Sequence, residues 1–232
     1  MALFSALDDV ELPPNPWFSW EYVQDHVDEL VAAGKEHLVI TLASVALAMV
    51  VAVPLALVVR RYPGLRGPVL ALGGVLYTIP ALALISILWP VFGLTPVTVT
   101  IALAVYALLV VLRNTLVGLE GVPADVVDAA RGMGYGRRRL LWRVEMPLAL
   151  PAILAGVRLA VVSTVGLVTI GALVGHGGYG TLILGGFVDN FYHAQIMTAT
   201  LLTVALAVVL EGVLLLVERL LTPWSRTRPA RS

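Results

Sequence analysis

The sequence predicts an all-α integral membrane protein with five spanning helices. Of the 232 residues, 59% are hydrophobic and only 13% are charged, too few polar side chains to cover a soluble domain of this length. Five segments reach the ~20 mostly apolar residues that a helix needs to cross a bilayer. Arginines gather in alternate links between these segments, as a chain with an odd number of spans requires. The formal net charge of zero gives no basic field for nucleic acid.

The predicted spans follow from the distribution of charge along the chain. The first runs from Leu38 to Val59 and contains one proline, Pro54. The stretch 68–111 contains no Asp, Glu, Lys or Arg, is too long for one span, and is divided by the turn-forming segment 90–96. The remaining predicted spans are, in chain order, Pro68–Trp89, Pro96–Gly118, Leu150–Val174 and Ala194–Leu221. Pro54 and Pro80 are expected to kink their helices.

The basic residues predict the orientation of the chain in the membrane. Arginines occur after the first span, between the third and fourth spans, and in the tail 222–232, whereas the links 90–95 and 175–193 contain neither Lys nor Arg. Because basic residues concentrate in cytoplasmic links, we expect a multi-pass protein of the bacterial cytoplasmic membrane with its N-terminus outside and its C-terminus in the cytoplasm.

The parts flanking the spans differ in character, which predicts three regions. Residues 1–37 are an extracytoplasmic amphipathic segment, in which Trp17, Phe18, Trp20 and Tyr22 are residue types that favour the membrane interface. Residues 38–221 form the transmembrane domain and residues 222–232 a basic cytoplasmic tail.

The link between the third and fourth spans, residues 120–148, carries the most informative pattern; we call it the signature loop. Pro123 suits the first turn of a short helix, which glycines at 132, 134 and 136 end. Arg137 begins a second short helix that Pro147 is expected to close.

The spacing within the signature loop resembles the permease family of ABC importers. That family carries Glu-Ala-Ala, three residues, Gly, nine residues, Ile, one residue and Leu-Pro on its cytoplasmic side. Here Asp128-Ala129-Ala130, three residues, Gly134, nine residues, Val144, one residue and Met146-Pro147 keep every spacing. The sequence departs from the pattern at 128, 144 and 146, each time with a chemically close residue.

This resemblance implies a five-helix type I importer permease whose loop couples it to an ATPase. The coupling residues would be Asp128, Ala129, Ala130, Gly134, Val144, Met146 and Pro147. The implied partners are a dimer of ATPase subunits, a second permease that is a paralogue or an identical copy, and an extracytoplasmic substrate-binding protein, with membrane lipid around the spans. The chain has no phosphate-binding motif of the form Gly-x-x-x-x-Gly-Lys-Ser/Thr. We therefore expect no cofactor in this chain and no enzymatic activity of its own, with ATP and Mg²⁺ bound by the partner ATPase.

Three shorter segments, beginning at Thr78, Arg113 and Thr169, resemble permeases for osmoprotectants. They imply a quaternary-ammonium solute such as glycine betaine, choline or carnitine. An ABC permease for methionine or another amino acid remains an alternative. An ion-coupled secondary transporter is disfavoured because no repeated halves are visible, and an intramembrane enzyme because paired catalytic residues are lacking.

Ionisable and polar residues within the spans are the candidates for the solute path. Arg158 and Glu211 are expected to pair with each other or to line a water-filled path, while Glu218 and Arg219 are expected to lie at the membrane interface. The candidate path-lining residues are Tyr77, Thr78, Ser86, Trp89, Asn114, Ser163, Thr164, Thr169 and Glu211. The four histidines show no ligand spacing, so no metal site is expected. The glycine-rich segment 175–180 matches a dinucleotide fingerprint, but no predicted strand precedes it, and we expect a loop at the outer gate.

Overall fold

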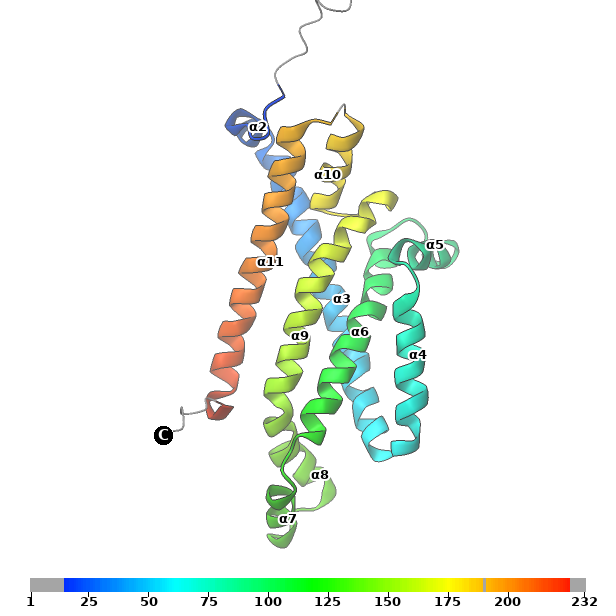
Figure 1. The fold of residues 1–232 in the computed structure, drawn as a ribbon, viewed down its shortest axis with the longest axis vertical. Coiled ribbons are helices and arrows are strands. Elements are labelled where there is room, and N and C mark those ends of the chain that lie inside the picture. Colours follow the sequence, from blue (N-terminus) through cyan, green and yellow to red (C-terminus); the bar gives the residue numbers. More distant parts are fainter. Residues whose placement is uncertain (1–14, 190, 226–232) are drawn as a thin grey trace, which may run out of the picture.

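Three long helices form the centre of the bundle: α3 (Val27–Arg61), α6 (Pro96–Glu120) and α9 (Met146–Val168). The computed structural model describes residues 15–189 and 191–225, and this part of the chain forms helices joined by short links, with no strand. Figure 1 shows α6 beside α9, with α3 behind both. These helices confirm the predicted first, third and fourth spans as apolar helices long enough to cross a membrane. The first is longer than expected, since it begins at Val27.

Small residues allow the central helices to approach closely. Ala48, Ala52 and Ala56 lie on the buried face of α3, at 0 or 1% exposure, within the main hydrophobic core. A Cβ atom on Gly156 of α9 would lie 2.4 Å from the Cβ atom of Asn114 on α6, so only glycine fits there. Close helix approach through small residues is the usual way that spanning helices associate.

The second predicted span bends at Pro80, as expected, but so sharply that it is broken into two helices. Helices α4 (Arg66–Thr78) and α5 (Ala81–Phe92) meet at an angle of 96°. Pro80 lacks an N–H and forces the preceding residue into an extended conformation, and Ile79 accordingly has ψ 126°. The hydroxyl of Tyr106 on α6 donates a hydrogen bond to the carbonyl of Ile79 and so satisfies a backbone group that the break leaves free. Pro54, in contrast, lies inside α3 without interrupting it.

The signature loop runs directly into the fourth span. Helix α7 (Ala124–Gly132) is followed by α8 (Arg137–Leu140), a π-helical turn η2 (Leu141–Glu145) and then α9, which ends in the 3₁₀ turn η3 (Thr169–Val174). The prediction that Pro147 closes a helix is wrong, because Pro147 lies in the first turn of α9. The wider π turn immediately before it accommodates a residue without an N–H.

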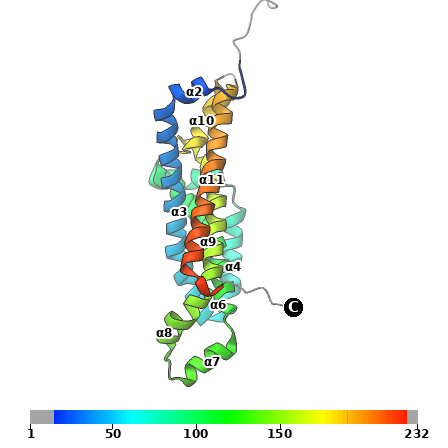
Figure 2. The same ribbon diagram turned by 90° about the vertical axis from the view of Figure 1, so that its left-hand side faces the viewer.

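The link between the fourth and fifth spans contains a helix that the sequence analysis took for a loop. Helix α10 (Tyr179–Val188) packs against α11 (His193–Leu221), as Figure 2 also shows. Gly178 and Gly180 of the dinucleotide-like segment permit close packing, because their Cβ atoms would lie 2.5 Å from the Cβ of His37 and 2.4 Å from the Cα of Thr169. The element before this segment is a 3₁₀ turn and not a strand, which agrees with rejecting a nucleotide site.

The fifth span is confirmed as a helix, but it lies at the edge of the bundle. In the most apolar stretch of α11, 6% of the residues are buried, compared with 56% in the corresponding stretch of α6. In Figure 1, α11 runs alongside α9 at the left-hand edge of the bundle, and α2 (Trp20–Asp25) and α10 lie at the end opposite α7 and α8. The first part of the N-terminal segment, residues 1–14, and the tail arginines at 226, 228 and 231 lie outside the described residues.

Candidate functional site

The signature loop is a helical hairpin closed by a left-handed glycine. After α7 ends at Gly132, Gly134 adopts φ +80°, a region that glycine enters at no cost. The N–H of Gly134 then donates to the carbonyl of Arg131 at 2.9 Å, and the N–H of Tyr135 donates to the carbonyl of Ala130 at 3.1 Å. This pair of bonds is a Schellman motif. The glycine of the family signature therefore has a backbone role in this chain, since it turns the loop back towards the bundle.

The predicted coupling residues divide into an exposed and a packed group. Asp128, Ala129 and Gly134 are exposed, and no heavy atom lies within 4 Å of the position that a Cβ atom on Gly134 would occupy. Ala130, in contrast, is 2% exposed. The residues at the base of the hairpin are half-buried: Val144, Met146 and Pro147. The structure thus presents the first half of the signature on a surface and packs the second half against the spans.

One ion pair ties the base of the signature loop to the end of α3. Nη2 of Arg60 lies 2.5 Å from Oε1 of Glu145, and the Glu145 side chain is only 10% exposed. A buried carboxylate requires such a partner. Arg66 and Glu120 form a second pair at 2.7 Å, but both of these side chains are well exposed. The sequence analysis missed the role of Glu145, although its position within the signature could have suggested it.

The candidate path-lining residues do not form one cluster in the single chain. Tyr77, Thr78 and Ser86 are exposed around the break between α4 and α5, while Glu211 lies on α11 at the other edge of the bundle (Figures 1 and 2). Ser163 is exposed on α9, between these edges. Any path through all of them would require a wall supplied from outside this chain.

Most of the candidate hydroxyl and amide groups bond to their own helix. Ser86 donates to the carbonyl of Leu82, Ser163 to that of Leu159, and the amide of Asn114 to that of Val110, each over four residues. Such bonds are ordinary for polar residues in spanning helices. The hydroxyl of Thr164 is buried and has no partner among the described residues.

Arg158 is the centre of an ion-pair triad that was only half predicted. It pairs with Glu211, as the sequence analysis allowed, and also with Glu218, whose Oε2 lies 2.7 Å from its Nη1. The sequence analysis did not foresee this second partner, since it placed Glu218 at the membrane interface without a role in pairing. Seven residues make about two turns of an α-helix, so Glu211 and Glu218 lie on the same face of α11, the face towards α9. The triad holds the edge helix to the centre.

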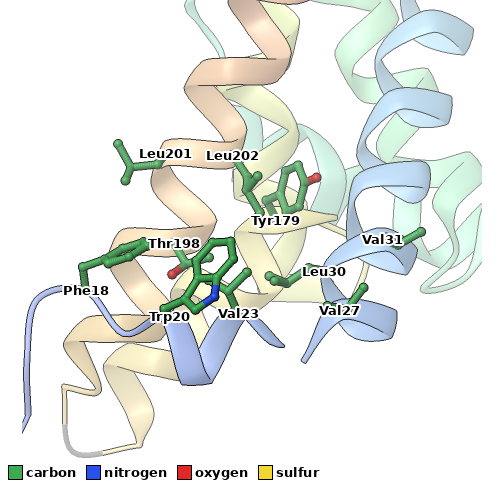
Figure 3. Close-up of a pocket in the computed structure, with 10 residues that line it drawn as sticks. All are labelled: Phe18, Trp20, Val23, Val27, Leu30, Val31, Tyr179, Thr198, Leu201 and Leu202. Atoms are coloured by element: carbon green, nitrogen blue, oxygen red, sulfur yellow. The ribbon is translucent and has the colours of Figure 1, made fainter. Parts of the chain in front are cut away.

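The opposite end of the molecule contains an apolar pocket of about 370 Å³ (Figure 3). Its walls come from α2, α3, α10, α11 and the segment before α2: Phe18, Trp20, Val23, Val27, Leu30, Val31, Tyr179, Thr198, Leu201 and Leu202. None of these residues is charged. Tyr22, on the same short helix as the lining residues Trp20 and Val23, is buried, and burial together with Glu29 raises its pKa to about 12, so its hydroxyl stays protonated. A wall so poor in polar groups suits an apolar guest better than a zwitterionic solute.

Solved structures with this arrangement of helices define the class of the fold. The methionine ABC transporter MetNI in inward-facing conformations matches with a TM-score of 0.77 at 22% identity, over 85% of this chain and 98% of that one. An amino acid ABC transporter matches with a TM-score of 0.71 at 16% identity, over 87% and 98%. The fold is that of a type I ABC importer permease.

The sequence comparisons place the chain within a family. Residues 44–223 match the binding-protein-dependent transport system inner membrane component family, and the chain belongs to it. It is therefore a transport subunit of the inner membrane. The choline transport system permease protein OpuBB of Bacillus subtilis (strain 168) is 33% identical over 88% of this chain and 93% of its own length. The carnitine transport permease protein OpuCB of Listeria monocytogenes is 34% identical over 87% and 92%, and the osmoprotectant import permease protein OsmW of Salmonella typhimurium (strain LT2) is 35% identical over 87% and 96%.

Proposed function

We propose that this chain is one permease subunit of an ATP-driven importer for a quaternary-ammonium osmoprotectant such as glycine betaine, choline or carnitine. The observation that carries the solute class is the similarity over nearly full length to permeases named for choline, carnitine and osmoprotectant transport. The likeness to the methionine transporter, at 22% identity, concerns the fold alone.

The signature loop is the part through which an ATPase acts. Its exposed half, with Asp128, Ala129 and Gly134, offers a surface on which a partner can dock, and its base continues without a break into α9. A displacement of the hairpin would therefore be passed along a rigid helix to the middle of the membrane. ATP and Mg²⁺ are bound by the partner, whose closure draws two such loops together and opens the path outward.

A second permease subunit supplies the missing wall of the path. Four candidate lining residues on α4, α5 and α9 are exposed on the single chain, which supports a path between two subunits: Tyr77, Thr78, Ser86 and Ser163. Among the relatives, OpuBB and OpuBD carry the name of the same choline transport system in Bacillus subtilis. These paired names support a paralogue rather than an identical copy as the second subunit.

The end with α7 and α8 lies in the cytoplasm, and the end with α2 and α10 lies outside. This orientation rests on the arginines of the links around Arg60 and Arg137 and on their absence from the links at the opposite end. An extracytoplasmic binding protein would then deliver solute near α5 and α10.

Uptake by the reconstituted complex tests the proposed function. The chain, its ATPase, its second permease and its binding protein are incorporated into proteoliposomes, and uptake of labelled glycine betaine, choline and methionine is measured with and without ATP. We expect ATP-dependent uptake of at least one quaternary-ammonium solute that persists when ionophores collapse ion gradients. Uptake of methionine alone would contradict the solute class, and uptake driven by an ion gradient without ATP would contradict the mechanism.

A further inference from the structure

A basic pocket of about 370 Å³ lies between the end of α3 and the signature loop. It is distinct from the exposed surface of Asp128 and Ala129 on which an ATPase would dock. Its walls come from α3, α7, α8 and η2: Leu57, Arg60, Arg61, Arg131, Arg137, Leu140, Leu141 and Glu145. Four of these side chains are arginines and one is a glutamate, so the walls carry a formal charge of +3 (4 − 1).

The arginines of this pocket have donors left over after their contacts within the chain. Arg60 pairs with Glu145 through Nη2, but its Nη1 is buried and has no acceptor among the described residues. Arg131 reaches Asp128 only at 3.4 Å, and no ion pair is recorded for Arg61 or Arg137 within the described part of the chain. A buried guanidinium nitrogen without an acceptor is costly. The pocket therefore offers donors that an anion could accept from.

The position of the pocket at the end of α3 indicates where such an anion would come from. Leu57 belongs to the apolar part of α3, and Arg60 and Arg61 end that helix. Leu140 and Leu141 add an apolar wall from the other side. The pocket thus combines apolar and cationic walls at the end of a spanning helix, the level at which lipid phosphates lie. Basic pockets at this boundary recognise anionic headgroups through charge-assisted hydrogen bonds.

We propose that this pocket binds the phosphate of an anionic membrane phospholipid, with its glycerol and the start of its acyl chains against the leucines. The headgroup joins the end of α3 to α7 and α8, and so braces the signature loop against the bundle. This site needs the chain to lie in the membrane but does not depend on which solute the importer carries.

Native mass spectrometry of the full-length protein tests the proposal. The protein is released in mild detergent and titrated with phosphatidylglycerol, with phosphatidylethanolamine, or with inorganic phosphate. Arg61→Gln and Arg137→Gln each remove one positive charge from the walls of the pocket. Arg138→Gln is the matched control, because Arg138 is the next residue of α8 and does not line the pocket. Arg60 is left in place, since its loss would strand Glu145.

We expect specific phosphatidylglycerol adducts that Arg61→Gln and Arg137→Gln each weaken about fivefold, as ~1 kcal/mol for an arginine near an anionic surface implies, and that Arg138→Gln leaves unchanged. Equal losses in all three variants, or none, would overturn the proposal. So would inorganic phosphate that displaces the lipid at similar concentration with the same arginine dependence, since the site would then serve a soluble anion. Loss of the lipid when the ATPase binds, with Arg137 protected by that subunit, would assign the arginines to a protein interface instead.

Discussion

Replacing Gly134 by alanine should weaken the binding of an ATPase to this permease without unfolding the helical bundle. The Cβ atom of alanine would meet no heavy atom within 4 Å in the single chain, so the cost is conformational and not steric. At φ +80°, an L-residue costs roughly 1–2 kcal/mol. That energy corresponds to a roughly 5- to 30-fold lower ratio of closed to open hairpin. The affinity for the ATPase should fall by up to a similar factor.

Three further variants separate the backbone effect from the docking surface. Gly132→Ala is the matched control, because Gly132 ends α7 at negative φ with open space around it, and alanine should be tolerated there. Gly134→Asn and Gly134→Asp both place at this position a residue that tolerates the left-handed region. They have the same shape and differ in charge, so a greater loss with aspartate isolates the electrostatics of docking.

The assay is binding of the purified ATPase to the permease in detergent, together with ATP-driven uptake in proteoliposomes. We expect Gly132→Ala to match the wild type, Gly134→Asn to lose less than Gly134→Ala, and Gly134→Asp to remain in the membrane without supporting uptake. If Gly134→Ala and Gly132→Ala behave alike, the left-handed turn has no part in coupling, and the reasoning from the Schellman motif is refuted.

Three other substitutions test the packing and the ion pairs by thermal unfolding of the purified permease. Gly156→Ala should destabilise by about 1–3 kcal/mol because its methyl group overpacks the contact of α9 with α6, whereas Gly166→Ala on the same helix meets open space and should be neutral or stabilising. Glu145→Gln should cost about 1–3 kcal/mol by unpairing a buried arginine nitrogen, whereas Glu120→Gln breaks an exposed pair and should stay within about 0.5 kcal/mol. Arg158→Gln leaves both Glu211 and Glu218 of α11 without a partner and should cost on the order of 2 kcal/mol or more, a larger loss than Glu211→Gln or Glu218→Gln alone. Each contact would be contradicted if its variant and the matched control variant unfolded at the same temperature.

Hydrophobic length and charge spacing sufficed to predict most of the fold. The spans around α3, α6, α9 and α11 each contain a long apolar run, and such runs have few alternatives to a helix in a membrane. A kink at Pro80 was predicted, but not a break of 96° between α4 and α5, because both halves are apolar and composition does not report an angle. Pro80 marked the place, but its consequence depends on Tyr106, which is distant in the sequence and bonds the carbonyl freed there.

The candidate site was predictable where it is local and not where it is assembled from distant segments. The spacing from Asp128 to Pro147 is contained in one loop, so the pattern was visible in the sequence. The ion pairs of Glu145 with Arg60 and of Glu218 with Arg158 join residues 85 and 60 positions apart. No periodicity connects such residues. Helix α10 was missed for a different reason, since glycines at 175, 177, 178 and 180 are typical of loops, although here Gly177, Gly178 and Gly180 allow close packing.

Cross-linking from the signature loop tests the central claim most directly, and the absence of cysteine from the chain removes any background. A single cysteine is placed at exposed Ala129 in α7, and in a control protein at exposed Leu94 at the opposite end. We predict that Ala129→Cys cross-links to the ATPase subunit with a yield that changes when ATP is added, whereas Leu94→Cys does not. Reagent reaching Ala129→Cys only from the cell exterior, or cross-linking it to no nucleotide-hydrolysing subunit, would contradict the account.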